Sequence, residues 1–155
     1  AGINIRNRSM QEMQPEDWDQ VMAINATGAY NCLHRVLPHM RSQKSGLVIQ
    51  ISSVAGKRSI ALGGVAYSAS KSARTSLGIC LSNEINQEGV RITTVYPGEV
   101  NTPILEARPT PVSEEHRQRI LQSDDVAQLI LSIANLPAHV HVPEVVIKPL
   151  TQQYY

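Results

Sequence analysis

Tyr67 and Lys71 are the two residues whose types and spacing best suit chemistry. They lie four positions apart, near the start of a segment with helical periodicity, so both side chains should lie on one helix face. A free tyrosine has a pKa near ~10 and is a poor base at neutral pH. A lysine cation at ~4 Å and an effective dielectric of ~20 contributes about 4 kcal/mol, enough to lower that pKa by roughly two to three units. The alternative is a surface pair whose side-chain stems pack together.

Serine and asparagine side chains offer a second set of candidates. Ser52 and Ser53 follow a predicted strand, and residues at the carboxyl ends of strands line the ligand crevice of open α/β sheets. A serine there can hold a substrate carbonyl, or it can simply satisfy loop backbone. Asn25 lies on the apolar stripe of a predicted helix, where an unpartnered amide costs on the order of 1–3 kcal/mol. Its side chain should therefore have specific hydrogen-bond partners. It could hold open a helix turn, bind a water, or be a hydrogen-bonded residue of the core.

The segment from Pro97 to Pro103 follows a second predicted strand. Gly98 lets the backbone approach a ligand closely. Exposed N–H groups and the Thr102 hydroxyl are suited to an amide or a phosphate, and a plain turn is the alternative.

The elements that must position these residues alternate between long helices and apolar strands. We expect helices over residues 15–41, 65–87 and 113–121 and from 123 onward, and strands over 47–51, 90–96 and 143–148. Pro38 should kink or end the last turn of the first helix. This order predicts an α/β fold, a Rossmann-like doubly wound parallel sheet, in one domain over residues 1–155. Neither G-x-G-x-x-G nor G-x-x-x-x-G-K-S/T occurs, so we expect the sheet to lack its N-terminal strands and Gly-rich loop.

Composition and charge limit the classes of ligand and binding partner that we expect. The 155 residues carry a net charge of +1, which gives no argument for a nucleic-acid or membrane partner. No apolar run reaches the ~18 residues that span a bilayer. Cys32 and Cys80 lie far apart in helical stretches, and we interpret both as reduced core thiols of a cytoplasmic protein. His139 and His141 have only Glu144 nearby as a further ligand, so we predict no metal site.

Together these segments resemble the short-chain dehydrogenase/reductase family. Five motifs carry the resemblance in family order: Ala1-Gly2 as the end of an N-N-A-G loop, Asn25 to Gly28 as N-x-x-G, Ile51 to Gly56 as the serine strand, Tyr67 to Lys71 as Y-x-x-x-K, and Pro97-Gly98 with Val100 and Thr102 as P-G-x-V/I-x-T. The resemblance implies that the chain is the C-terminal catalytic part of one Rossmann-fold domain, with roughly 85–95 residues missing in front.

The resemblance also implies an activity: an NAD(P)-dependent oxidoreductase that interconverts an alcohol and a ketone or aldehyde by hydride transfer. Tyr67 would be the general acid/base, and Lys71 would lower its pKa and bond the nicotinamide ribose. Ser53 would hold the substrate oxygen and Asn25 would anchor a water of a proton relay. Ser52 remains a lesser candidate, because the interval from Ser53 to Tyr67 is one residue longer than expected. The implied cofactor-binding residues are Ala1, Gly2, Tyr67, Lys71, Pro97, Gly98, Val100 and Thr102.

The finer implications concern cofactor, substrate and assembly. The cofactor would be NADP or NAD, with NADP favoured. The ending, from Leu136 to Gln152, resembles the subgroup acting on 3-hydroxy acids and serine-like substrates, while 3-oxoacyl-carrier-protein reductases share every core motif. The family implies a homodimer or homotetramer formed through the two long helices. We expect the 155 residues alone to be inactive, and a non-catalytic dimerising module or a pseudoenzyme is the alternative function.

Overall fold

Residues 2–154 are described by the structure, a computed structural model. Within them, β1 (Gly46–Ile51), β2 (Val90–Pro97) and β3 (Glu144–Ile147) form one sheet in the order β1–β2–β3. Both pairings are parallel, with Gly46 opposite Val90 and Val95 opposite Val145. The carboxyl ends of the strands therefore lie at one edge of the sheet, as the alternating order of elements predicts.

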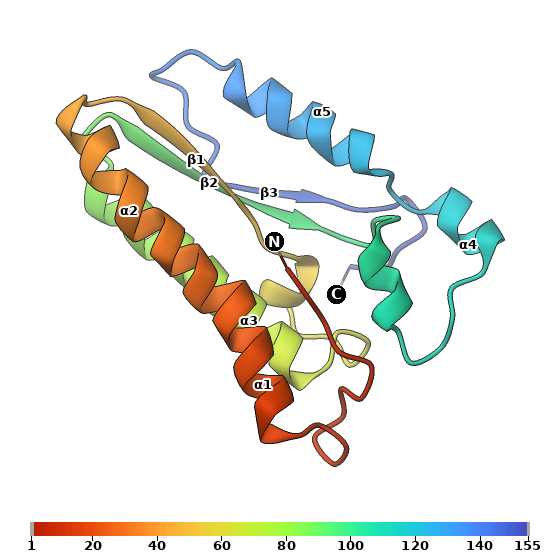
Figure 1. Cartoon of the computed structure of the whole chain (residues 1–155). Coiled ribbons are helices and arrows are strands. Elements are labelled where there is room, and N and C mark those ends of the chain that lie inside the picture. Colours follow the sequence, from red (N-terminus) through yellow and green to blue (C-terminus); the bar gives the residue numbers. More distant parts are fainter. Residues whose placement is uncertain (1, 155) are drawn as a thin grey trace.

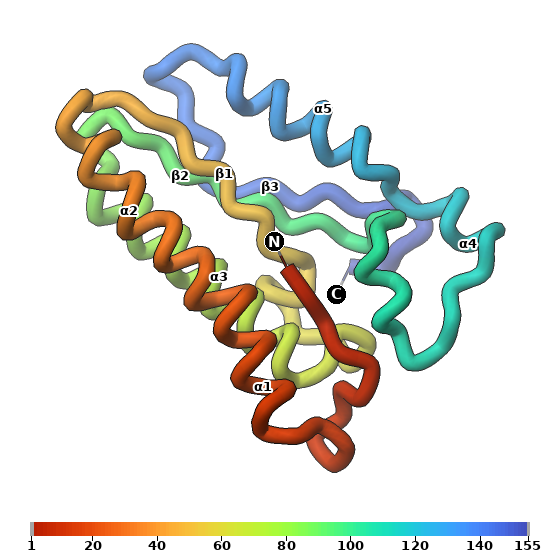
Figure 2. The backbone as a smooth tube through the Cα atoms, viewed as in Figure 1, coloured from red at the N-terminus to blue at the C-terminus, as the bar shows by residue number. Residues whose placement is uncertain are grey.

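The helices lie on both faces of this sheet (Figure 1). The first group is α1 (Pro15–Met22), α2 (Gly28–Ser42) and α3 (Val65–Ile85), and α5 (Ser123–Ala134) lies on the opposite face. The short helix α4 (Glu114–Arg119) and two 3-10 turns, η2 (Val54–Gly56) and η3 (Pro103–Ala107), lie in the connections. The doubly wound α/β architecture is confirmed. The N-terminal segment, residues 2–14, passes beside the end of β1 (Figure 2).

The first long helix differs from its prediction in two places. One π-helical turn, η1 (Ala23–Thr27), joins α1 to α2, so the predicted helix over residues 15–41 forms with a widened turn inside it. Pro38 lies within α2, which continues to Ser42. Proline does not end this helix, because its exposed position lets solvent satisfy the carbonyl that its missing N–H leaves free.

The core between helices and sheet is apolar. Its buried centre consists of Leu33, Leu37, Ile85, Val90 and Ile92. Cys32 and Cys80 are exposed, so the interpretation of both as core thiols is wrong. Cys32 directly precedes the core residue Leu33, but one position along a helix turns a side chain by about 100° and out of the core.

Helix α3 approaches the sheet more closely than a side chain permits. A Cβ on Gly78 would lie 2.5 Å from Thr94 Oγ1 and 2.6 Å from Gln50 Nε2. A Cβ on Gly56 would lie 2.6 Å from the carbonyl oxygen of Lys71. Glycine at these positions therefore sets how near the helix sits to the strand ends.

We expect Gly78→Ala to lower the free energy of unfolding, although alanine is the better helix former. Overpacking against Thr94 costs about 1–3 kcal/mol, which outweighs a helix-propensity gain of about 1 kcal/mol. Gly28→Ala is the matched control, because its Cβ would lie 3.5 Å from the carbonyl oxygen of Ala23, an ordinary contact. Denaturant unfolding of both variants measures this; a Gly78→Ala protein as stable as Gly28→Ala would contradict the packing.

Candidate active site

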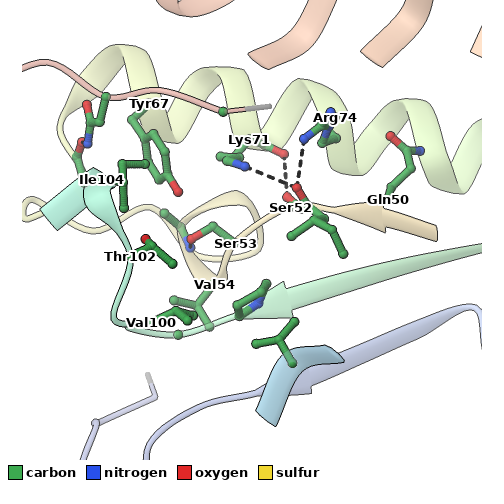
Figure 3. A pocket seen from close by; sticks show the side chains of 18 of the residues that line it. Gln50, Ser52, Ser53, Val54, Tyr67, Lys71, Arg74, Val100, Thr102 and Ile104 are labelled. Carbon is green, nitrogen blue, oxygen red and sulfur yellow. Dashed lines mark hydrogen bonds between the residues drawn. The ribbon is translucent and has the colours of Figure 1, made fainter. Parts of the chain in front are cut away.

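A cavity of about 710 Å³ opens at the carboxyl edge of the sheet. Its walls come from the N-terminal segment, α2, β1 and the loop after it, α3, the segment after β2 and the start of α5. Figure 3 shows part of this lining. The candidate residues that line it are Gly2, Ser52, Ser53, Tyr67, Lys71, Pro97, Gly98, Val100 and Thr102. Asn25 does not line it, and Ala1 lies outside the described residues.

The start of α3 fixes the position of Tyr67. Gly64 precedes the helix with φ +80°, a left-handed conformation that favours glycine. A Cβ there would also lie 2.6 Å from the Cβ of Arg8. The helix therefore begins at Val65, which places Tyr67 in its first turn and Lys71 one turn later on the same face.

Lys71 is a buried cation, 5% exposed. Its Nζ donates to the carbonyl oxygen of Ile51 at 3.2 Å and lies 5.5 Å from the centroid of the Tyr67 ring. Burial, and then the positive charge of Arg74, lower the pKa of Lys71 to about 7. Lys71 is therefore only partly charged at neutral pH.

The protonation of Tyr67 differs from the sequence-based prediction. The net shift of the Tyr67 pKa is upward, because burial of the phenol outweighs the effects that favour the phenolate. Those opposing effects come from a hydrogen bond with Ser53 and from the charges of Arg74 and Arg8. The expectation that Lys71 lowers this pKa is not met, because Lys71 Nζ lies over the ring, donates to backbone and is itself partly neutral.

The two serines after β1 point to different partners. Ser52 Oγ donates to the carbonyl oxygen of Lys71 at 3.0 Å and lies 3.1 Å from Thr75 Oγ1, so it joins the strand end to α3. Ser53 Oγ accepts from the backbone N–H of Ala55 at 3.1 Å, and the Ser53 side chain favours the ionised form of the Tyr67 phenol. Of the two serines, Ser53 is therefore the one whose side chain affects the Tyr67 phenol.

Asn25 is fully buried in the π-helical turn, and its amide has specific partners. Oδ1 accepts from the N–H of Ile3 at 2.8 Å, while Nδ2 donates to the Ile3 carbonyl at 2.9 Å and to Ser70 Oγ at 3.0 Å. A Cβ on Gly2 would lie 3.5 Å from Lys71 Nζ and 3.6 Å from Asn25 Oδ1. Asn25 thus holds the N-terminal segment against α3, directly behind Lys71.

The sequence interpretation missed Arg8. This buried arginine donates from Nε to the Ile5 carbonyl at 2.9 Å, from Nη1 to the Leu62 carbonyl at 2.7 Å and from Nη2 to the Ala107 carbonyl. It therefore ties the N-terminal segment, the loop before α3 and η3 around one cavity wall. Its partners are backbone atoms up to 99 residues away, so no local spacing reveals the role.

Glu99 joins Arg108 and His116 beside the cavity. It contacts Arg108 Nη2 at 3.1 Å and the ring of His116, and so holds the η3 and α4 segments together. Burial would raise the pKa of Glu99, but the hydrogen bond with His116 and the charge of Arg108 leave it lowered. His116 contacts this carboxylate although its side chain is half exposed.

Residues 2–154 hold neither a metal-ligating cluster nor a membrane-spanning helix. No group of three metal-ligating side chains occurs among them. None of the helices formed within the same range has the length and apolar character needed to traverse a bilayer.

Comparison with known proteins identifies the family. The family model for short chain dehydrogenases matches residues 1–112. The chain belongs to the short-chain dehydrogenase family. An uncharacterized oxidoreductase of Listeria innocua is 33% identical over 99% of this chain and 64% of its own length. A 3-oxoacyl-(acyl-carrier-protein) reductase of Thermotoga maritima is 33% identical over 87% of this chain and 56% of its own length.

Solved structures of two dehydrogenases have the same fold as this chain. A closed form of serine dehydrogenase complexed with NADP+ superposes with a TM-score of 0.89 at 28% identity, covering 99% of this chain and 64% of that one. Serine dehydrogenase from Escherichia coli gives a TM-score of 0.83 at 27% identity, covering 99% and 63%. The chain spans between 56% and 64% of the length of these relatives.

We expect Asn25→Leu to lower the free energy of unfolding by about 1–3 kcal/mol, since it removes three hydrogen bonds from a buried site. The amide of Ile3 should also exchange faster with deuterium, because it loses its acceptor. Asn7→Ala, at an exposed position, is the control. Unchanged protection at Ile3 in the Asn25→Leu protein would contradict the anchoring role.

The low pKa of Lys71 predicts a pH-dependent stability. With a folded pKa of about 7 against an ordinary 10.5, the unfolded chain binds more protons between these values, so stability should rise from pH 7 toward pH 10. Lys71→Met should remove most of this slope, and Lys57→Met, at an exposed lysine, should keep it. Denaturant unfolding across the pH range measures the slope; an equal slope in Lys71→Met and the unmodified protein would refute the assignment.

Proposed function

We propose that the full-length protein is an NAD(P)-dependent oxidoreductase that interconverts an alcohol and a ketone or aldehyde. The observation that carries the proposal is the meeting of Tyr67, Lys71 and Ser53 on one cavity in a chain of this family. These residues come from one helix face and one strand end, which the fold brings together.

The cavity suits a nicotinamide dinucleotide. Among the described residues, Lys71 Nζ has a single hydrogen-bond acceptor, which leaves donors for a ribose hydroxyl. Gly2, Gly98, Val100 and Thr102 line the same cavity and offer backbone and hydroxyl groups to the carboxamide and a phosphate. The cofactor supplies the hydride when bound. Similarity to a serine dehydrogenase complexed with NADP+ favours NADP over NAD.

The chain's own residues handle the proton. Because burial raises the Tyr67 pKa, the phenol carries its proton at neutral pH and can give it to a carbonyl oxygen during reduction. Ser53 holds that oxygen beside the phenol. Asn25 holds the N-terminal segment through Ile3, and it would anchor a water that extends a proton relay from Lys71.

The substrate we propose is a small hydroxy acid or a 3-oxoacyl compound. Similarity to serine dehydrogenase over nearly the whole chain favours the hydroxy acid, and similarity to the Thermotoga reductase supports the oxoacyl compound. We also propose a homodimer or homotetramer formed through α2 and α3. Tyr30 of α2 and Ile79 of α3 are exposed apolar side chains that such an interface would cover.

We expect Tyr67→Phe in the full-length protein to lower kcat at least ~100-fold, the contribution of a general acid, and to leave the Kd for NADPH nearly unchanged. Steady-state kinetics and calorimetry measure the two quantities. Tyr30→Phe removes an exposed hydroxyl on α2 and is the control. If Tyr67→Phe keeps the unmodified kcat, the catalytic assignment of Tyr67 is wrong.

A further inference from the structure

Arg74 carries a second positive charge into the site, one turn beyond Lys71 on α3. Its Nη1 donates to the carbonyl oxygen of Ile51 at 2.9 Å, and Lys71 Nζ donates to the same oxygen at 3.2 Å. Figure 3 shows both side chains converging on the end of β1. Two cations thus share one backbone acceptor at the wall of the cavity.

The guanidinium of Arg74 is half-buried and only partly satisfied. Its Nε is buried and has no hydrogen-bond partner among the described residues, and the amide of Gln50, on the same cavity, is also unpartnered there. Arg74 is therefore fixed by its one contact with Ile51 rather than by an ion pair. Within residues 2–154 no carboxylate neutralises it, so its charge acts on the neighbouring groups.

We propose that Arg74 is a positioning residue of this site, which supplies a permanent positive charge at the end of β1, beside Lys71 and Tyr67. The inference rests on the proposed oxidoreductase function. Lys71 cannot supply a permanent charge, because it loses its proton within the neutral range. Burial lowers the pKa of Arg74, yet arginine remains protonated in proteins.

The other charged or titratable groups that act on this centre, among the residues that the structure describes, come from three elements. Tyr67 and Lys71 share α3 with Arg74, Arg8 of the N-terminal segment acts on Tyr67, and Cys32 of α2 faces Arg74. Arg8 donates from all three guanidinium nitrogens to backbone carbonyls, so it is held in place by the loops. Of these groups, Arg74 is the one whose charge acts on both Tyr67 and Lys71.

The test follows the protonation of the Lys71 amine through the chemical shift of its ε-carbon, measured by carbon-13 NMR in the full-length protein. Lys71→Met assigns the signal. In the unmodified protein Lys71 should titrate near 7. In Arg74→Met the midpoint should move up by about one pH unit, a tenfold change in the ratio of neutral to charged Lys71. The Lys71 pKa should not return to its ordinary value, because burial, the larger cause of its lowering, remains in the variant. Arg74→Lys retains the charge and should keep the midpoint low.

Arg41→Met removes an exposed arginine at the far end of α2 and serves as the control for loss of charge. An unchanged Lys71 midpoint in Arg74→Met would overturn the proposal, and so would an equal rise in Arg41→Met. The pH profile of kcat/KM should move with the Lys71 midpoint in Arg74→Met, which a purely structural role would not cause. If the protein turns over no substrate, the lysine titration still decides the role of Arg74, so failure of the proposed function and failure of this inference are distinguishable.

Discussion

The close approach of α3 to the carboxyl ends of the strands is the constraint on which the site depends. Where α3 meets the sheet and the loop after β1, Gly78 and Gly56 leave no room for a Cβ, so the helix lies directly against the strand ends. That contact puts Lys71 within hydrogen-bonding distance of the last residue of β1, and Tyr67 one turn earlier beside Ser53. A site assembled from one helix face and one strand end is more rigid than one built from loops alone.

The same close packing determines the charge states. Burial makes the phenolate of Tyr67 and the ammonium of Lys71 expensive, so both groups shift toward their neutral forms. The groups that stay charged in this environment are two arginines. Arg8 donates to three backbone carbonyls, and Arg74 and Lys71 donate to the same backbone carbonyl. Burial and fixed arginine charge together, more than a simple lysine–tyrosine pair, set the electrostatics.

Much of the fold follows from local pattern. Apolar strands alternating with long helices predicted the parallel sheet, and the Tyr67–Lys71 spacing predicted a shared helix face, because both depend on short-range periodicity. The net pKa shift of Tyr67 and the role of Arg8 depend on contacts between distant segments, which periodicity does not encode. Asn25 lies between these cases: its need for partners was predictable, but its bond to Ile3 was not.

Transfer of deuterium tests the central claim most directly. The full-length protein would be incubated with NADPH deuterated at C4 and with a series of small 2- and 3-oxo acids and 3-oxoacyl thioesters, and the products would be analysed by mass spectrometry. The account predicts an alcohol that carries deuterium on the former carbonyl carbon for at least one of these compounds. A folded protein that binds NADPH but transfers no deuterium to any of them would contradict the assignment of Ser53, Tyr67 and Lys71 as a carbonyl-reducing site.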